Sequence, residues 1–387
     1  MGNKSTRLKV AVKPELLRWA RERAGRTIDS LEKAFPKYKQ WESGEAHPTL
    51  KQLERLAKML HVPLGFLFLE ATPEESLPIP DFRTMPAAAQ RPSPDLLDTI
   101  YLCQQRQEWY RGYLQTLGAK ALPFVGTADP DDNPIKIAAG IRRGLHLDLK
   151  ERRNMSTWTA ALRRFIEQAE AMGILVMSSS IVGNNPHRKL DPQEFRGFVL
   201  VDDLAPVIFI NAADTTSAQM FTMAHELAHV WLGQSGVSDA NVAVFPERGV
   251  ERWCNQVAAE LLVPMATFRR TYQPTEELRQ ELDRLARHFK VSTLVILRRI
   301  YEIEALSREA FWQAYQEELV HLRQFERRGE GGGDFYRTLN TRVSKSFAQA
   351  VVISALEGHT LFRDAYQMLG IRKAETLWEF AKVLGIR

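Results

Sequence analysis

The chain is organised around one stretch, Met223-Ala-His-Glu-Leu-Ala-His-Val-Trp-Leu-Gly233. Within it, His225, Glu226 and His229 form the pattern H-E-x-x-H. On a helix, positions i and i+4 lie on one face, so both imidazoles can bind the same ion. Zinc binds neutral imidazole readily, and its catalytic sites combine three protein ligands with one water. The pattern therefore predicts two zinc ligands. Glu226 is then the carboxylate that takes a proton from the water and later passes it to a leaving amine.

The residues around this motif favour a helix. N-cap candidates occur in Asp214-Thr-Thr-Ser217, residues 218–232 contain neither proline nor glycine, and Gly233 is a typical C-cap residue. The helix is apolar enough to be largely buried. Two histidines in a buried helix can also be ordinary hydrogen-bonded core residues, so the zinc interpretation depends on a third ligand.

A second helix, predicted to end before Pro264, supplies candidates for that ligand. Glu251 and Asn255 are at positions i and i+4. Glu251 could therefore bind the ion while Asn255 orients one of the histidines. Glu260 is the competing carboxylate, about two and a half turns further along. Cys254 is a softer alternative ligand, or simply a small buried residue.

These residues together carry a family resemblance. The pattern His225-Glu226-x-x-His229, followed by Glu251-x-x-x-Asn255-x-x-Ala-Ala-Glu260-Leu-Leu-x-Pro264, resembles the ImmA/IrrE family of zinc metallo-endopeptidases over roughly residues 130–300. The resemblance implies a zincin-like fold that binds Zn2+ through His225, His229 and Glu251, with Glu226 as the catalytic residue. It also implies a substrate, because family members with this layout cut repressor-type helix-turn-helix proteins.

Length and composition place the chain in a broad class. At 387 residues it is long enough for two or three domains, and 44% hydrophobic with 26% charged residues is ordinary for a soluble globular protein. No apolar run is long enough to span a membrane, and the basic N-terminus lacks the apolar core of a signal peptide. The only two cysteines, Cys103 and Cys254, favour a reducing compartment, so we expect a cytoplasmic protein.

The positive charge is concentrated at the N-terminus. Residues 1–70 contain 14 Lys/Arg and 8 Asp/Glu, whereas the remainder contains 38 and 39. A local basic excess favours contact with phosphates, although it can equally be a solvated surface.

The same N-terminal region resembles an XRE-type helix-turn-helix domain. The resemblance rests on Trp41-Glu42-x-Gly44-x-x-x-Pro48-Thr49 and Gln52-Leu53-x-x-Leu56-Ala57. The interval before Trp41 is roughly four residues shorter than usual, and it holds the start of the recognition helix, which reads bases in the major groove. The candidate DNA contacts that remain are Lys37, Lys39 and Gln40, and a protein-binding module is the alternative.

We therefore expect a mainly α (α+β) chain with four parts. Residues 1–70 are the XRE-like domain, 71–120 a proline-rich linker and long helix, 121–305 the zinc metallopeptidase domain, and 306–387 a helical C-terminal region predicted to contain three helices after residue 335. In the linker, Pro-Ile-Pro-Asp-Phe-Arg83 is predicted to run extended and to dock on the protease domain.

The protease domain is expected to contain a small antiparallel sheet before the H-E-x-x-H helix. Its predicted strands are residues 174–177, 198–201 and 206–211, which are rich in β-branched and aromatic residues. Val207–Ile210 is the candidate edge strand for binding the substrate backbone, although it can equally be purely structural.

The sequence thus predicts a zinc endopeptidase that cleaves a repressor-like regulator and carries a DNA- or protein-binding N-terminal module. The alternative is a regulatory binding protein or toxin–antitoxin component that binds a partner protein or DNA through its helix-turn-helix and C-terminal segments. A plain DNA-binding repressor is the third possibility, weakened by the short recognition region.

Overall fold

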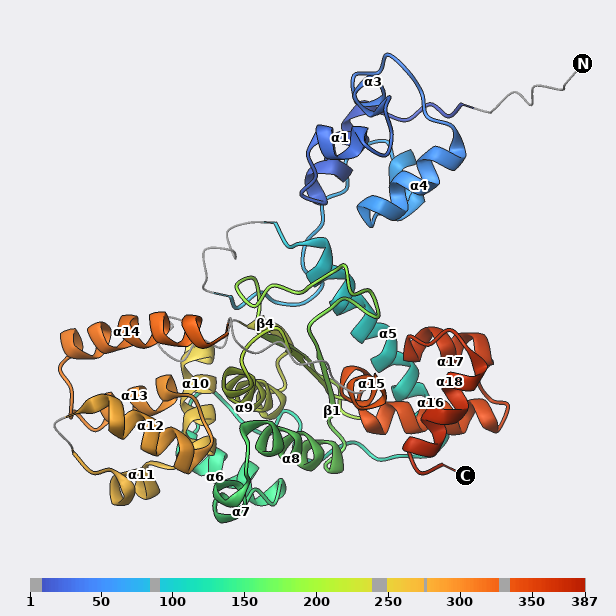
Figure 1. The fold of residues 1–387 in the computed structure, drawn as a ribbon. Coiled ribbons are helices and arrows are strands. Elements are labelled where there is room, and N and C mark those ends of the chain that lie inside the picture. Colours follow the sequence, from blue (N-terminus) through green and yellow to red (C-terminus); the bar gives the residue numbers. More distant parts are fainter. Residues whose placement is uncertain (1–8, 84–90, 239–248, 275–276, 327–334, 387) are drawn as a thin grey trace, which may run out of the picture. The chain divides into compact units, whose positions relative to one another are not determined.

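The computed structural model describes residues 9–83, 91–238, 249–274, 277–326 and 335–386 (Figure 1). It confirms a mostly helical α+β protein with one small sheet. The chain forms two compact units, one from residues 1–78 and 90–98 and the other from residues 79–89 and 99–387. Within the described ranges, no helix is long and apolar enough to cross a membrane.

The N-terminal unit is a small helical cluster. Its elements are α1 (Pro14–Arg23), α2 (Ile28–Glu32), α3 (Tyr38–Glu42), α4 (Leu50–Leu60) and the 3-10 helix η1 (Leu64–Phe68). Thr49 and Gln52 form a reciprocal capping box that starts α4. The buried side chains of this unit, including Tyr38 and Trp41, form a separate hydrophobic cluster.

The second unit begins with helices around a four-stranded sheet. In chain order these are α5 (Pro94–Thr116), whose first residues belong to the N-terminal unit, α6 (Pro134–Gly144), α7 (Leu149–Asn154), α8 (Trp158–Ala171), β1 (Leu175–Ser179), β2 (Gly197–Leu200), β3 (Val207–Asn211), α9 (Thr216–Leu232) and β4 (Gly236–Ser238).

The sheet differs from the prediction in two ways. Its strand order is β1-β3-β2-β4, and β1 pairs with β3 in parallel, so the sheet is mixed and not antiparallel. The candidate edge strand Val207–Ile210 lies in β3, between β1 and β2. That candidate was wrong, because both sides of β3 are already hydrogen-bonded within the sheet.

Both faces of the sheet are covered. α9 packs against β2 and β3, where Val199, Ile208 and Ile210 join its hydrophobic cluster. On the opposite face, α5 approaches through Gln107, which donates hydrogen bonds to the carbonyl oxygens of Leu200 and Ala205, each at 2.9 Å. Successive strand residues point to opposite faces of the sheet. Because both faces are covered, β1, β2 and β3 are buried along their whole length.

The remaining helices follow β4 in the chain. They are α10 (Gly249–Leu262), α11 (Met265–Thr271), α12 (Leu278–Phe289), α13 (Thr293–Glu302), α14 (Arg308–Glu326), α15 (Phe335–Val343), α16 (Lys345–Leu356), α17 (Phe362–Leu369) and α18 (Ala374–Val383). α10 packs on α9, whereas α15 packs beside β1. The tail after residue 335 contains four helices and not three, because Ser344 adopts a positive φ of 69° and separates α15 from α16.

Candidate metal centre

The H-E-x-x-H motif lies on α9, as predicted. Thr215 caps the helix by accepting a hydrogen bond from the Ala218 amide at 3.2 Å, and Gly233 ends it with a φ of 70°. α9 packs between the sheet and α10, and His225, Glu226 and His229 are each at most 1% exposed. The helix therefore holds the motif in a closed interior site.

Three donor atoms converge in this site. The Nε2 atoms of His225 and His229 are 3.1 Å apart. Glu251, on α10, places one carboxylate oxygen 3.3 Å from the first nitrogen and the other 3.0 Å from the second. Among the described residues, these three side chains are the group of histidine, cysteine and acidic residues that could hold a metal ion.

The spacing fits zinc. Ligand atoms about 2.0–2.2 Å from a tetrahedral zinc ion lie roughly 3.3–3.6 Å from one another. The separations of 3.0 to 3.3 Å between these donors are close to that spacing. Glu251 Oε1 has no hydrogen-bond partner among the described residues although His229 Nε2 lies 3.0 Å away, so these atoms point to a shared position between them.

Asn255 supports one of the histidines. Its Oδ1 lies 3.0 Å from His225 Nδ1, on the opposite side of the ring from the cluster. An amide oxygen accepts, so Nδ1 carries the proton and Nε2 keeps its lone pair for a metal. Asn255 therefore occupies the orienting position that the sequence assigned to it.

The two competing ligands lie outside the cluster. Glu260 faces away, accepting hydrogen bonds from the Met265 amide at 3.2 and 3.1 Å and pairing with Arg299 at 2.8 Å. Cys254 is fully buried, and burial raises the pKa of its thiol, which opposes formation of the metal-binding thiolate.

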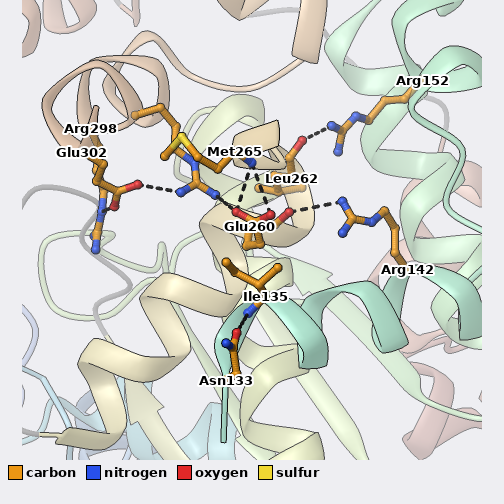
Figure 2. Close-up of polar contacts among 10 residues, drawn as sticks. Asn133, Ile135, Arg142, Arg152, Glu260, Leu262, Met265, Arg298 and Glu302 are labelled. Atoms are coloured by element: carbon orange, nitrogen blue, oxygen red, sulfur yellow. Dashed lines mark hydrogen bonds and ion pairs between the residues drawn. The ribbon is translucent and has the colours of Figure 1, made fainter. Parts of the chain in front are cut away.

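Figure 2 shows what Glu260 does instead. Two arginines donate hydrogen bonds to carbonyl oxygens at the end of α10. Arg142 donates to the carbonyl of Glu260 at 3.3 Å, and Arg152 donates to that of Leu262. The Glu260 carboxylate meanwhile caps the start of α11. This network closes a helix end whose last carbonyls have no partner within the helix.

Electrostatics link the three converging groups. Burial alone would lower the pKa of His225, but the Glu251 carboxylate outweighs it and raises the pKa of His225 to about 9. Burial alone would raise the pKa of Glu251, but both histidines outweigh it and hold that pKa well below its usual range. These two shifts favour a protonated His225 beside an ionised Glu251.

The environment of Glu226 is different. Burial raises the pKa of its carboxyl group, and the hydroxyl of Ser238, on β4, donates a hydrogen bond to Oε1. Oε2 is buried and has no hydrogen-bond partner among the described residues. A Cβ at Gly197 would lie 3.0 Å from Oε1, so this glycine leaves room for the carboxylate. Glu226 thus has one fixed oxygen and one available oxygen.

Sequence reasoning missed Ser238 and Phe82 as neighbours of the motif. The Phe82 ring stacks on the His229 imidazole, with centroids 5.6 Å apart and an interplanar angle of 16°. Neither residue belongs to a spacing pattern, because tertiary folding brings each one to the site. The one available signal was the extended Pro-Ile-Pro-Asp-Phe-Arg83 segment that contains Phe82.

The candidate DNA contacts are on the N-terminal unit. Lys37, Lys39 and Gln40 are exposed, the last two on the five-residue α3. Their neighbours Tyr38 and Trp41 are buried. Alternation of this kind leaves the polar side chains accessible to a partner.

An H-E-x-x-H helix beside a glutamate-bearing helix is a ligand layout that zinc metalloproteases use. Residues 169–301 match the sequence profile Peptidase_M78, the IrrE N-terminal-like domain. That match includes the whole metal cluster and supports a metallopeptidase-like domain of the ImmA/IrrE type. Residues 343–382 match a second profile, the domain of unknown function DUF8813. No match to the chain was found among curated proteins.

Proposed function

We propose that this protein is a zinc-dependent endopeptidase of the ImmA/IrrE type. The observation that carries the proposal is the convergence of His225, His229 and Glu251 on one position, with Glu226 on the same helix turn. The Peptidase_M78 match over residues 169–301 supports the same assignment. Zinc, when bound, would supply Lewis-acid polarisation of the scissile carbonyl and a nucleophilic water.

The chain's own residues then have distinct roles. His225, His229 and Glu251 bind the ion, and Asn255 keeps His225 in the binding tautomer. Glu226 accepts a proton through Oε2, which is free of hydrogen bonds within the described ranges, and delivers it to the leaving amine, while Ser238 holds Oε1 in place. Burial raises the pKa of Glu226, so its carboxylate takes up a proton more readily than an exposed glutamate does.

The substrate we propose is a repressor-like regulatory protein, recognised with help from the N-terminal unit. The exposed Lys37, Lys39 and Gln40 and the basic excess of that region suit contact with DNA phosphates or with an acidic protein surface. An XRE-type domain could therefore bring the enzyme to a repressor on its operator.

The test combines metal content with a search for cleavage products. Elemental analysis should find one zinc per chain in the wild type and in Glu260→Ala, and none in Glu251→Ala. Glu226→Gln should keep its zinc. New protein N-termini should appear in cells that express the wild type and be absent from cells that express Glu226→Gln.

Two results would contradict the proposal. Wild-type protein that stays free of zinc after reconstitution would remove the metal, and undiminished cleavage by Glu226→Gln would remove the mechanism. A stoichiometric partner that binds the wild type and His225→Ala equally would instead favour the alternative, a regulatory or toxin–antitoxin binding protein.

A further inference from the structure

Residues 80–82 of the chain lie along the open edge of the sheet. Phe82 donates a backbone hydrogen bond to the Val237 carbonyl at 2.9 Å, and the Val237 amide donates to the Pro80 carbonyl at 2.9 Å. Asp81 thus forms a parallel bridge with Val237 in β4. Both backbone groups that Val237 could offer to an added strand are therefore occupied by the protein itself.

This edge is the one beside the reactive carboxylate. β4 also contains Ser238, the residue that binds Glu226. The opposite edge strand, β1, packs beside α15. A peptide that adds to the sheet next to Glu226 must consequently use the outer edge of β4.

The occupying segment also covers a metal-binding histidine. Phe82 stacks nearly flat on His229, whose Nδ1 has no hydrogen-bond partner in the described part of the chain. Close packing of Phe82 depends on Gly236, where a Cβ would lie 2.4 Å from two ring carbons. β4, Gly236 and His229 together contact this one aromatic side chain.

An ion pair with a buried arginine anchors the segment next to this aromatic contact. Arg83, whose side chain is 1% exposed, binds Asp81 through two bonds, of 2.9 and 2.8 Å. Its guanidinium also lies 3.8 Å from the Glu194 carboxylate, just before β2. Arg83 therefore fixes the segment to the body of the second unit.

We propose that the outer edge of β4 is the peptide-binding edge of the metal site, and that residues 80–82 fill it as an intramolecular occupant. This proposal rests on the proposed endopeptidase function. The ligand class is an extended peptide that places an aromatic side chain between Gly236 and His229, as Phe82 does. A substrate binds only after it has displaced this occupant.

The pairing of residues 80–82 with β4 is short. Its ladder contains two backbone hydrogen bonds, and Pro80 has no N–H with which to extend it. The first segment of the N-terminal unit ends at Pro78, and the next residue, Ile79, belongs to the second unit. A partner that engages the N-terminal unit can therefore act on the occupant through the covalent chain.

The test uses a fluorescein-labelled peptide, Pro-Ile-Pro-Asp-Phe-Arg, that copies residues 78–83. Its binding to full-length Glu226→Gln protein is compared with binding to the same protein carrying Phe82→Ala, or Phe362→Ala as a control with an exposed aromatic on α17. Phe82→Ala should bind the peptide about tenfold more tightly, because the position between Gly236 and His229 is then open to the aromatic side chain of the peptide and the occupant has lost its ring contact. Phe362→Ala should not change the affinity, and a peptide with alanine in place of phenylalanine should not bind.

Trypsin gives a second readout that needs no variant. Cleavage after Arg83 should be slow in the wild type and should accelerate about tenfold with saturating peptide, since access tracks the open population. The alanine peptide should not accelerate it. Equal peptide affinity in Phe82→Ala and its parent, or cleavage after Arg83 that ignores the peptide, would overturn the proposal.

Neither peptide affinity nor trypsin access requires catalysis. The endopeptidase proposal and the occupant proposal can therefore be contradicted independently. Zinc content and product N-termini decide the endopeptidase. Peptide affinity and trypsin access decide the occupant, and both can be measured on zinc-loaded and zinc-free protein.

Discussion

At the scale of single residues, the site is a cluster of groups that are unfavourable without a cation. Two imidazole nitrogens and a carboxylate lie 3.0 to 3.3 Å apart in a closed interior. The raised pKa of His225 favours a proton there, which offsets the negative charge of Glu251. A divalent ion does the same more completely, so proton release and metal binding must be linked.

The pH dependence of metal affinity follows from that linkage. Metal requires neutral His225, whose pKa is raised from 6.5 to about 9 by Glu251, against the effect of burial. Zinc affinity should therefore still rise about tenfold from pH 7 to pH 8, whereas an ordinary histidine would already be neutral. Competition with a chromophoric chelator measures it, and a flat affinity between pH 7 and pH 8.5 would contradict the expectation.

The raised pKa of His225 also determines how the stability of the metal-free protein changes with pH. A raised histidine pKa stabilises the folded state fully below pH 6.5, and that contribution is lost as pH rises through about 9. Bound zinc removes the proton, so the zinc-loaded protein should not lose this contribution over the same range.

Asn255 provides a prediction that does not depend on pH. Asn255→Ala removes the acceptor for His225 Nδ1, so zinc affinity should fall about 10–100-fold. Arg252→Ala, an exposed neighbour on α10, is the matched control and should bind zinc as the wild type does. Equal losses in both variants would show that α10 and not the hydrogen bond is responsible.

Residues joined by local spacing could be predicted from the sequence, and those joined by tertiary folding could not. The spacings from His225 to His229 and from Glu251 to Asn255 are helical, so each pair had to share a face. Phe82 and Ser238 reach the same site from segments that are distant in sequence and carry no periodic pattern. The choice between Glu251 and Glu260 likewise needed the packing of α10 against α9.

At the scale of elements, strand positions were easier to predict than strand pairing. The three predicted strands coincide with β1, β2 and β3 to within two residues at each end. Short runs rich in β-branched and aromatic residues mark a strand, but they carry no information about which neighbour it pairs with. The order β1-β3-β2-β4 places β3 inside the sheet, and β4 is too short to show a pattern.

The junction between α10 and α13 yields a stability prediction. Glu260 is 5% exposed and pairs with Arg299, which also binds Glu302 at 2.6 Å. Glu260→Ala removes one of two partners from a buried guanidinium and uncaps α11, so the free energy of unfolding should fall by about 2–4 kcal/mol.

Two further measurements make that prediction specific. Zinc content of Glu260→Ala should stay at the wild-type level, because Glu260 lies outside the metal cluster. Glu167→Ala, an exposed glutamate on α8, should leave stability unchanged in the same urea titration. A Glu260→Ala protein that is fully stable but lacks zinc would reassign this residue to the metal.

At the scale of the whole molecule, each unit has a hydrophobic cluster of its own among the described residues. Tyr38 and Trp41 belong to the cluster of the N-terminal unit, and α9 and α10 to that of the second. Each cluster can therefore melt as a cooperative unit of its own. A calorimetric scan should resolve two transitions, and a change confined to one core should move only one of them.

Glu42 is the residue that tests this. It is 7% exposed and accepts two hydrogen bonds from Arg21, at 2.8 and 2.9 Å, which tie α3 to α1. Glu42→Gln should lower the stability of the N-terminal unit by about 1.5–3 kcal/mol, which moves the transition of so small a unit down by roughly 10 °C. The transition of the second unit should stay where it is, and Glu45→Gln, exposed nearby, should move neither.

Repeating the comparison of the wild type with Glu42→Gln at low pH tests whether the charge of Glu42 is responsible. Burial alone would raise the pKa of Glu42, but its bonds to Arg21 and Tyr38 outweigh burial and lower that pKa below 4.5. A depressed carboxylate pKa means that the stabilisation is present above the unfolded value and is lost as pH falls through the folded value. The difference between the wild type and Glu42→Gln should therefore be full at pH 7 and shrink towards pH 2. A difference that persists unchanged in acid would show that Glu42 acts through packing, and a shift of both transitions at pH 7 would show that the two units unfold together.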